Sequence, residues 1–191
     1  MALSVTMTAL STLLAALMTP TLTALLAGNR IEVSALGLFL DTVQVVILPV
    51  AGGALLKWKF PRLIAPVLPA APLVAVLTIT LIVASVIGAS REQIFDAGGR
   101  LLLAIFLLHA LGFVFGYLAG KTMLRRENAA RTVAIEVGMQ NSGLGVVLAR
   151  GNFTNPLVAV PSAISTVCHS LIGSLAAAWW SRSEPDTGSA T

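Results

Sequence analysis

The chain has 191 residues, of which 57% are hydrophobic and only 10% are Asp, Glu, Lys or Arg. Soluble domains carry about 25% charged residues, so this composition excludes an ordinary soluble domain and indicates a chain that lies in a lipid bilayer. A net charge of +4 would suggest nucleic acid as the partner of a soluble protein. Here the basic residues fall between long apolar segments, so no nucleic-acid partner is predicted.

The first half of the chain predicts three membrane-spanning helices, each near the roughly 20 apolar residues that a spanning helix needs. The first covers residues 2–27, which include no Asp, Glu, Lys or Arg, and Pro20 predicts a kink within it. The second covers residues 33–56 and contains a single charge, Asp41. Asp41 is either a residue that lines a pathway or a charge near the membrane interface. The third helix covers residues 64–87.

The second half of the chain predicts three more helices. The fourth covers residues 101–120 and has three glycines on one face, which lets another helix approach closely: Gly112, Gly116 and Gly120. The fifth covers residues 130–150 and is expected to break near 140–143. The sixth covers residues 156–180, and residues 182–191 predict a disordered cytoplasmic tail. We therefore predict an all-α, polytopic membrane protein with one membrane domain over residues 1–181.

Basic residues are distributed unevenly between the loops. The gaps after the second and fourth helices, together with the tail, hold eight of the twelve: Lys57, Lys59, Arg62, Lys121, Arg125, Arg126, Arg131 and Arg182. Loops rich in Lys and Arg stay on the cytoplasmic side of a membrane. The sequence therefore predicts a multi-pass protein of the inner (plasma) membrane with both chain ends in the cytoplasm.

Residues 135–145 read IEVGMQNSGLG and hold the most informative pattern in the chain. A carboxylate at membrane depth persists only where it faces a partner or a wet cavity, so Glu136 marks a functional site, a structural ion pair or a protonated carboxyl packed in the bundle. On a helix, Gln140 would share its face. Three glycines in eight residues favour a broken helix, whose free carbonyls and amides bind ions and substrates in many secondary carriers. A carboxylate, a side-chain amide and free backbone carbonyls are hard oxygen donors, which suit an alkali cation.

Polar stripes also mark the first and sixth helices. In the first helix, hydroxyls follow a helical spacing: Ser4, Thr8, Ser11 and Thr12. They could line a pore or complete a cation site, although hydrogen bonds to their own backbone or to another helix are favoured on spacing alone. In the sixth helix, His169 could donate to an anionic substrate or bond to a neighbouring helix. His109 lies among Leu and Ala in the fourth helix, which favours a structural role.

No pattern in the sequence indicates an enzyme. There is no phosphate-binding glycine loop, no HExxH motif and no cluster of metal ligands. Cys168 is the only cysteine, which excludes a disulfide within the chain and a cysteine-based metal site. We therefore predict neither catalysis nor a bound cofactor.

The run IEVGMQNSGL at residues 135–144 closely resembles the signature of the bile acid:sodium symporter family, because it joins a membrane glutamate to a broken-helix sequence. Residues 3–8 and 158–161 look similar too, and the resemblance extends to about residue 180. It implies a fold of ten helices in two inverted repeats, in which broken helices four and nine cross and two sodium ions bind. The six helices here would be family helices five to ten.

The resemblance also implies which residues bind ions and substrate. Glu136 would contact both sodium ions, and the rest of the metal set would be Ser4 and Thr8 at the first site, with Val137, Met139 and Gln140 at the second. Asn141 and His169 would face the organic anion that is carried with the sodium ions. Bacterial bile-acid carriers often have Asn after this His, where the chain has Ser170, which weakens the case for bile acid as the substrate.

The resemblance further implies that four family helices are missing ahead of Met1. We expect the C-terminal part of a sodium-coupled carrier of a bile-acid-like or small organic anion, completed by a missing N-terminal half or a partner chain. Two alternatives remain open. One is a short membrane protein without transport activity that acts as an interaction or assembly subunit, and the other is a carrier coupled to protons through Glu136.

Overall fold

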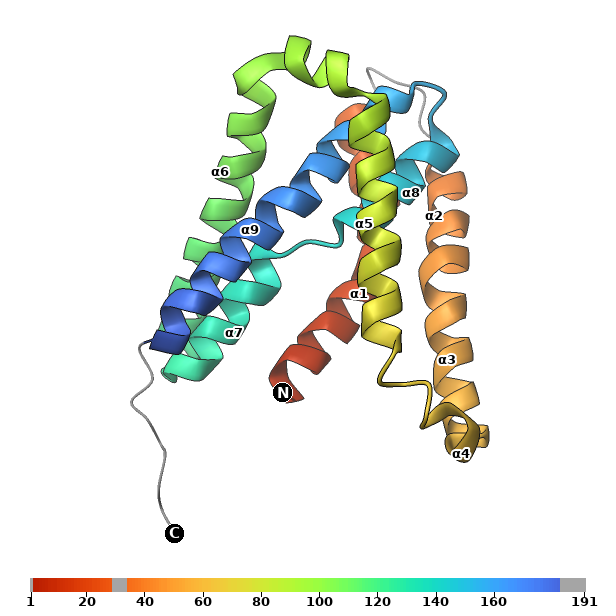
Figure 1. The fold of residues 1–191 in the computed structure, drawn as a ribbon, viewed down its shortest axis with the longest axis vertical. Coiled ribbons are helices and arrows are strands. Elements are labelled where there is room, and N and C mark those ends of the chain that lie inside the picture. The colour runs from red at the N-terminus through yellow and green to blue at the C-terminus, as the bar shows by residue number, and fades with distance from the viewer. Residues whose placement is uncertain (1, 29–33, 183–191) are drawn as a thin grey trace. The chain divides into compact units, whose positions relative to one another are not determined.

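A computed structural model describes residues 2–28 and 34–182, and this part of the chain is almost entirely helical (Figure 1). The predicted all-α fold is confirmed over these residues. Contacts divide the chain into two units, one formed by Met1–Asp96 with Ser142–Ala163 and the other by Ala97–Asn141 with Ile164–Thr191. The predicted tail falls almost wholly outside the described residues.

The first unit is built mainly from five helices of the N-terminal half and from one helix that returns to them. Its helices are α1 (Ala2–Ala27), α2 (Ala35–Thr42), α3 (Leu48–Lys59), α4 (Pro61–Ile64), α5 (Ala71–Ala89) and α8 (Ser142–Asn152). A π-helical turn, Val43–Ile47, joins α2 to α3, so the two run on as one stack in Figure 1. The helix α1 continues through Pro20.

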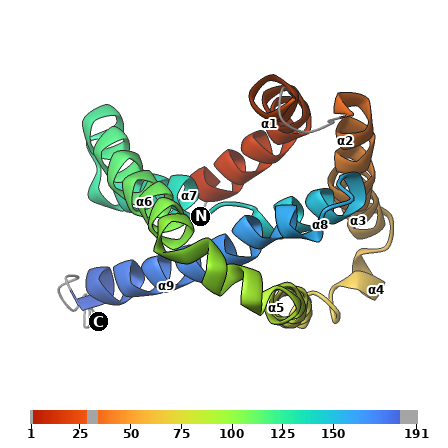
Figure 2. The ribbon, with the colours of Figure 1, turned by 90° about the horizontal axis from the view of Figure 1, so that it is seen from above.

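Helix α8 packs against α2 and α5, and Figure 2 shows it beside α2. The Asn152 side-chain amide donates a hydrogen bond of 2.7 Å to the Asp41 carboxylate. This carboxylate also lies close to Gly151, where an added Cβ atom would be 3.3 Å from it. Asp41 therefore links α2 to the end of α8, a partner 111 residues away that the sequence pattern did not indicate.

The second unit contains most of α6 (Arg91–Leu124), all of α7 (Glu127–Gly138) and most of α9 (Val160–Arg182), which follows a short 3-10 turn, Pro156–Ala159. Helix α6 begins well before residue 101, where the sequence predicted its start. The apolar pattern marks only the part of a helix that fits in lipid, whereas backbone hydrogen bonds continue into the polar residues before it.

Five helical segments of the described chain are long and apolar enough to cross a membrane: Leu3–Leu26, Ala35–Lys59, Ala71–Ala89, Gly99–Leu124 and Pro156–Arg182. The fifth predicted helix, residues 130–150, is present as two shorter helices, α7 and α8. Large apolar side chains point outward along the spans, and Leu81, Leu175 and Trp179 are each more than 70% exposed. Such an exposed apolar surface is typical of a protein that is surrounded by lipid.

Candidate cation-binding site

The predicted break in the fifth helix is present, and it falls at residues 139–141 (Figure 1). The Met139 amide donates the last helical hydrogen bond, 2.8 Å long, to the carbonyl of Ile135. Met139 itself is extended, with φ −91° and ψ 118°. A helix that ends here lacks the next turn, whose amides would otherwise bond the carbonyls of its last turn.

A stripe of glycines on α6 brings α7 very close, as the sequence predicted. A Cβ atom on Gly120 would lie 2.7 Å from Cα of Ala130, and one on Gly116 would lie 2.9 Å from the carbonyl oxygen of Val133. Real Cβ atoms essentially never come this close to another backbone. Only glycine therefore allows this packing, which lays α7 directly on α6.

The end of α7 rests on an aromatic ring of α6. Gly138 is buried, and a Cβ atom on it would overlap the ring of Phe113. The carbonyl oxygen of Val137 lies beside α6 as well, 3.2 Å from the position of a Cβ atom on Gly112. The place where the helix stops is thus determined by packing in addition to the local glycine content.

A buried polar cluster lies at the end of the glycine stripe, next to the break. His109 on α6 has none of its surface exposed, and its Nδ1 atom lies 2.8 Å from the carbonyl oxygen of Gly138. Its Nε2 atom is hydrogen-bonded to the Ser165 hydroxyl on α9. The ring of His169, one turn further along α9, meets the His109 ring edge-on with 5.1 Å between centroids. The cluster therefore joins α6, α7 and α9.

Most of the predicted metal set lies at this break. Glu136 is half-buried, whereas Val137, Met139 and Gln140 are exposed within the second unit. These residues are consecutive or nearly so, so a carboxylate, an amide and backbone carbonyls all belong to the end of α7 and the link that follows it. The Met139 side chain turns toward α9, where its Sδ atom would lie 3.2 Å from a Cβ atom on Gly173.

The two residues predicted to face the substrate have different surroundings. Asn141 is exposed at the end of the extended link. His169 is only 6% exposed, and neither of its ring nitrogens has a hydrogen-bond partner among the described residues. Both belong to the second unit.

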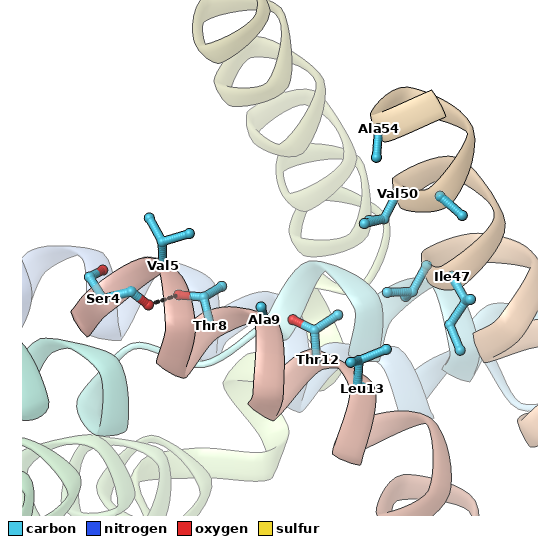
Figure 3. A pocket seen from close by; sticks show the side chains of 11 residues that line it. Ser4, Val5, Thr8, Ala9, Thr12, Leu13, Ile47, Val50 and Ala54 are labelled. Atoms are coloured by element: carbon cyan, nitrogen blue, oxygen red, sulfur yellow. Dashed lines mark hydrogen bonds between the residues drawn. The ribbon is translucent and has the colours of Figure 1, made fainter. Parts of the chain in front are cut away.

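Ser4 and Thr8, predicted for the first sodium site, lie on α1 in the first unit. Their side chains line an open groove of about 530 Å³, together with Thr12 and with apolar residues of α1, of the π-helical turn and of α3 (Figure 3). The Thr8 hydroxyl donates a 3.0 Å hydrogen bond to the Ser4 carbonyl, which is the backbone bonding that the spacing favoured.

Comparison with known proteins decides the family. The model of the Sodium Bile acid symporter family matches residues 1–97, about half of the chain. The chain belongs to this family. Its apolar helices and its membership together make it a multi-pass membrane protein, and the family's members that it resembles are transporters.

Curated relatives of this symporter family resemble nearly the whole chain. It is 50% identical over 184 residues to the "Probable sodium/metabolite cotransporter BASS1, chloroplastic" of Arabidopsis thaliana, which covers 96% of the chain and 46% of the relative. It is 41% identical over 181 residues to the "Uncharacterized sodium-dependent transporter YocS" of Bacillus subtilis (strain 168), covering 95% and 56%. The chain thus spans about half the length of the curated relatives it matches.

From the sequence of this family member we predicted a structural role for His109, and we did not single out Ser165. A signal for His109 was present, because it lies three residues before Gly112 and so shares the face of the glycine stripe. Its contact with the broken helix follows from that position. No comparable pattern identifies Ser165.

A charged cluster ties the other end of α7 to α6 and α9. The Tyr117 hydroxyl donates to both carboxylate oxygens of Glu127, at 2.9 and 3.1 Å, and Lys121 also binds this carboxylate. Arg131 donates to Glu127 at 3.2 Å and lies over the ring of Trp180. Hydrogen bonds from Lys121, Tyr117 and Arg131 lower the pKa of Glu127 to about 2.

The stability of the protein should depend on pH through Glu127, which lies outside the candidate spans. Because its pKa is lowered from 4.5 to about 2, the folded state gains stability above pH 4.5 and loses that gain as the pH falls toward 2. Thermal unfolding of detergent-solubilised protein should show Glu127→Gln to be slightly less stable near neutral pH. The difference should vanish toward pH 2. A difference that stays constant over this range would exclude the mechanism.

Proposed function

We propose that this chain forms the sodium-binding part of a secondary carrier that moves an organic anion together with sodium. The observation that supports this most is the break at residues 139–141, where Glu136 lies within the last turn of α7. The carbonyl end of a helix carries partial negative charge, and a carboxylate beside it adds more. Together they attract a cation to a point within the membrane.

Two sodium sites fit the kinds of donor that this chain supplies. Hydroxyls of Ser4 and Thr8 would serve the first site, and the carbonyls of Val137 and Met139 with the Gln140 side chain would serve the second. Hydroxyl, carbonyl, amide and carboxylate oxygens are all hard donors, the kind that alkali cations prefer. No sulfur or imidazole ligand enters the set, which argues against a transition metal as the transported ion.

The substrate we propose is an organic anion with an apolar part. Asn141 precedes the amide end of α8, and that end favours a negative charge. His169 would add a donor. Taken by itself, the groove in the first unit is lined by apolar side chains such as Val50 and Leu13 and by a few hydroxyls, which suits an apolar ligand.

The orientation that we propose places both ends of the chain on the cytoplasmic side. Its basis is the exposed basic residues in the last turn of α3, Lys57 and Lys59, and directly after α6, Arg125 and Arg126. The membrane would be the plasma membrane of the cell.

Uptake by the purified protein tests the function directly. The protein would be extracted from its own membrane at the length the cell makes, its intact mass measured, and the protein reconstituted into liposomes. We expect an inward sodium gradient to drive uptake of a small organic carboxylate, and an equal potassium gradient to drive none. Uptake that follows a pH gradient and ignores sodium would instead establish proton coupling, and absence of both would support a non-transporting subunit.

A further inference from the structure

The most completely buried polar contact in the second unit lies at the break of the proposed carrier helix. His109 is fully buried, and its partners Gly138 and Ser165 come from two other helices. Gly138 is the last residue of α7, two positions after Glu136 and directly before Met139. The contact therefore holds the backbone at the point from which the proposed cation ligands extend.

The hydrogen-bond chemistry assigns separate tasks to the two ring nitrogens. A carbonyl oxygen can only accept, so the Nδ1 atom of His109 carries a proton and donates it to Gly138 across 2.8 Å. This donor replaces the amide that a continuous helix would have supplied to the same carbonyl. The Ser165 hydroxyl on the Nε2 side and the edge of the His169 ring hold the imidazole in its orientation.

The consequence for ion binding is geometric. A carbonyl that lacks a partner in a buried site turns toward whatever donor it can reach, because leaving it unsatisfied is unfavourable. If the Gly138 peptide turned, the neighbouring carbonyls of Val137 and Met139 would turn with it, since one backbone connects them. Ligands for a bare alkali ion must converge closely, so such a rotation would weaken binding.

We propose that His109 is a positioning residue of the sodium site: its Nδ1–H caps the broken end of α7 and so holds the cation-binding backbone in place. The proposal rests on the proposed function, because it concerns the affinity for the coupling ion. His109 does not contact sodium itself. Its effect is transmitted through the Gly138 peptide.

Two substitutions separate the two nitrogens of the imidazole. In His109→Asn the side-chain amide reaches about the position of Nδ1 and can still donate to Gly138. In His109→Gln it reaches about the position of Nε2 and contacts Ser165 instead. We expect the sodium concentration for half-maximal uptake to change less than about threefold in His109→Asn and to rise about tenfold or more in His109→Gln.

A purely structural role predicts a different result. It would lower the melting temperature of both variants without changing their sodium dependence, and a matched core variant, Val86→Ala, measures this effect in the first unit, where Val86 is 1% exposed. Equal sodium affinity in His109→Asn and His109→Gln would overturn the proposal. Substrate affinity at saturating sodium should stay unchanged in both.

A variant that leaves His109 in place covers the case in which neither substitution folds. Ser165→Ala removes the hydroxyl and keeps the Nδ1–H bond to Gly138, so the sodium concentration for half-maximal uptake should rise by less than about threefold. A rise of about tenfold in this sodium concentration would show that the hydrogen bond to Gly138 does not by itself maintain the sodium affinity. Sodium-independent uptake by the unsubstituted protein would refute the proposed function itself. This result differs from a failure of the present inference, in which uptake depends on sodium but the His109 variants do not behave as expected.

Discussion

Replacing Glu136 by Gln is expected to raise the sodium concentration for half-maximal uptake by about 30-fold or more, and Glu136→Ala to abolish sodium dependence. Gln keeps the shape and one acceptor oxygen but removes the charge that compensates the cation. Charge-assisted contacts are about twice as strong as neutral ones. Glu136 is half-buried in the last turn of α7, next to the break. Sodium-dependent uptake into liposomes, measured over a range of sodium concentrations, gives the value.

An exposed carboxylate provides the control for Glu136. Glu92 pairs with Arg91 at 3.9 Å near the start of α6, and both side chains are at least 75% exposed. Glu92→Gln removes the same charge from the protein and should leave sodium dependence unchanged, because solvent screens it. Full sodium-driven uptake by Glu136→Ala would refute the assignment of Glu136 to the sodium sites.

The second large effect is expected from Gly138→Ala, which should destabilise the protein by about 1–3 kcal/mol and also impair sodium binding. On an open helix this change would stabilise by about 0.5–1 kcal/mol, because Ala is the better helix former. Here the new methyl group would overlap the Phe113 ring, so α7 must move away from α6 or the ring must leave its place. Thermal unfolding in detergent, followed by tryptophan fluorescence, measures the loss.

Two further variants identify the overlap as the cause. Gly88→Ala on α5 has no neighbouring atom within 4 Å of the new Cβ, so it should be neutral or slightly stabilising. Phe113→Leu reduces the ring that the methyl group meets. In a double-mutant cycle it should recover part of the stability lost in Gly138→Ala. Strict additivity of the two changes would contradict the packing explanation.

Much of the architecture followed from local chemistry. The near absence of charge over long segments predicted spanning helices, since burying charge in lipid is strongly unfavourable. The glycines and polar residues after Glu136 predicted a break, because a continuous helix is poor at such a sequence. The intervals of four between Gly112, Gly116 and Gly120 predicted a face for close packing, which α7 occupies.

The position of the break was predicted less well than its existence. The sequence placed it at 140–143, whereas the helix ends at Gly138. His109 and Phe113 determine this end, since one takes the Gly138 carbonyl and the other covers its Cα atom. Both lie at least 25 residues earlier in the chain, so no local pattern could report them.

The sequence by itself determined that this protein lies in a membrane and that it is built from apolar helices with one break, because these features depend on transfer into lipid and on local backbone preference. Only the tertiary structure decided which groups complete the site's surroundings. The bond between His109 and Gly138 and that between Asp41 and Asn152 join residues 29 and 111 positions apart. Such pairs form because helices pack closely enough to bury polar groups, and a buried polar group must find a partner wherever the fold supplies one.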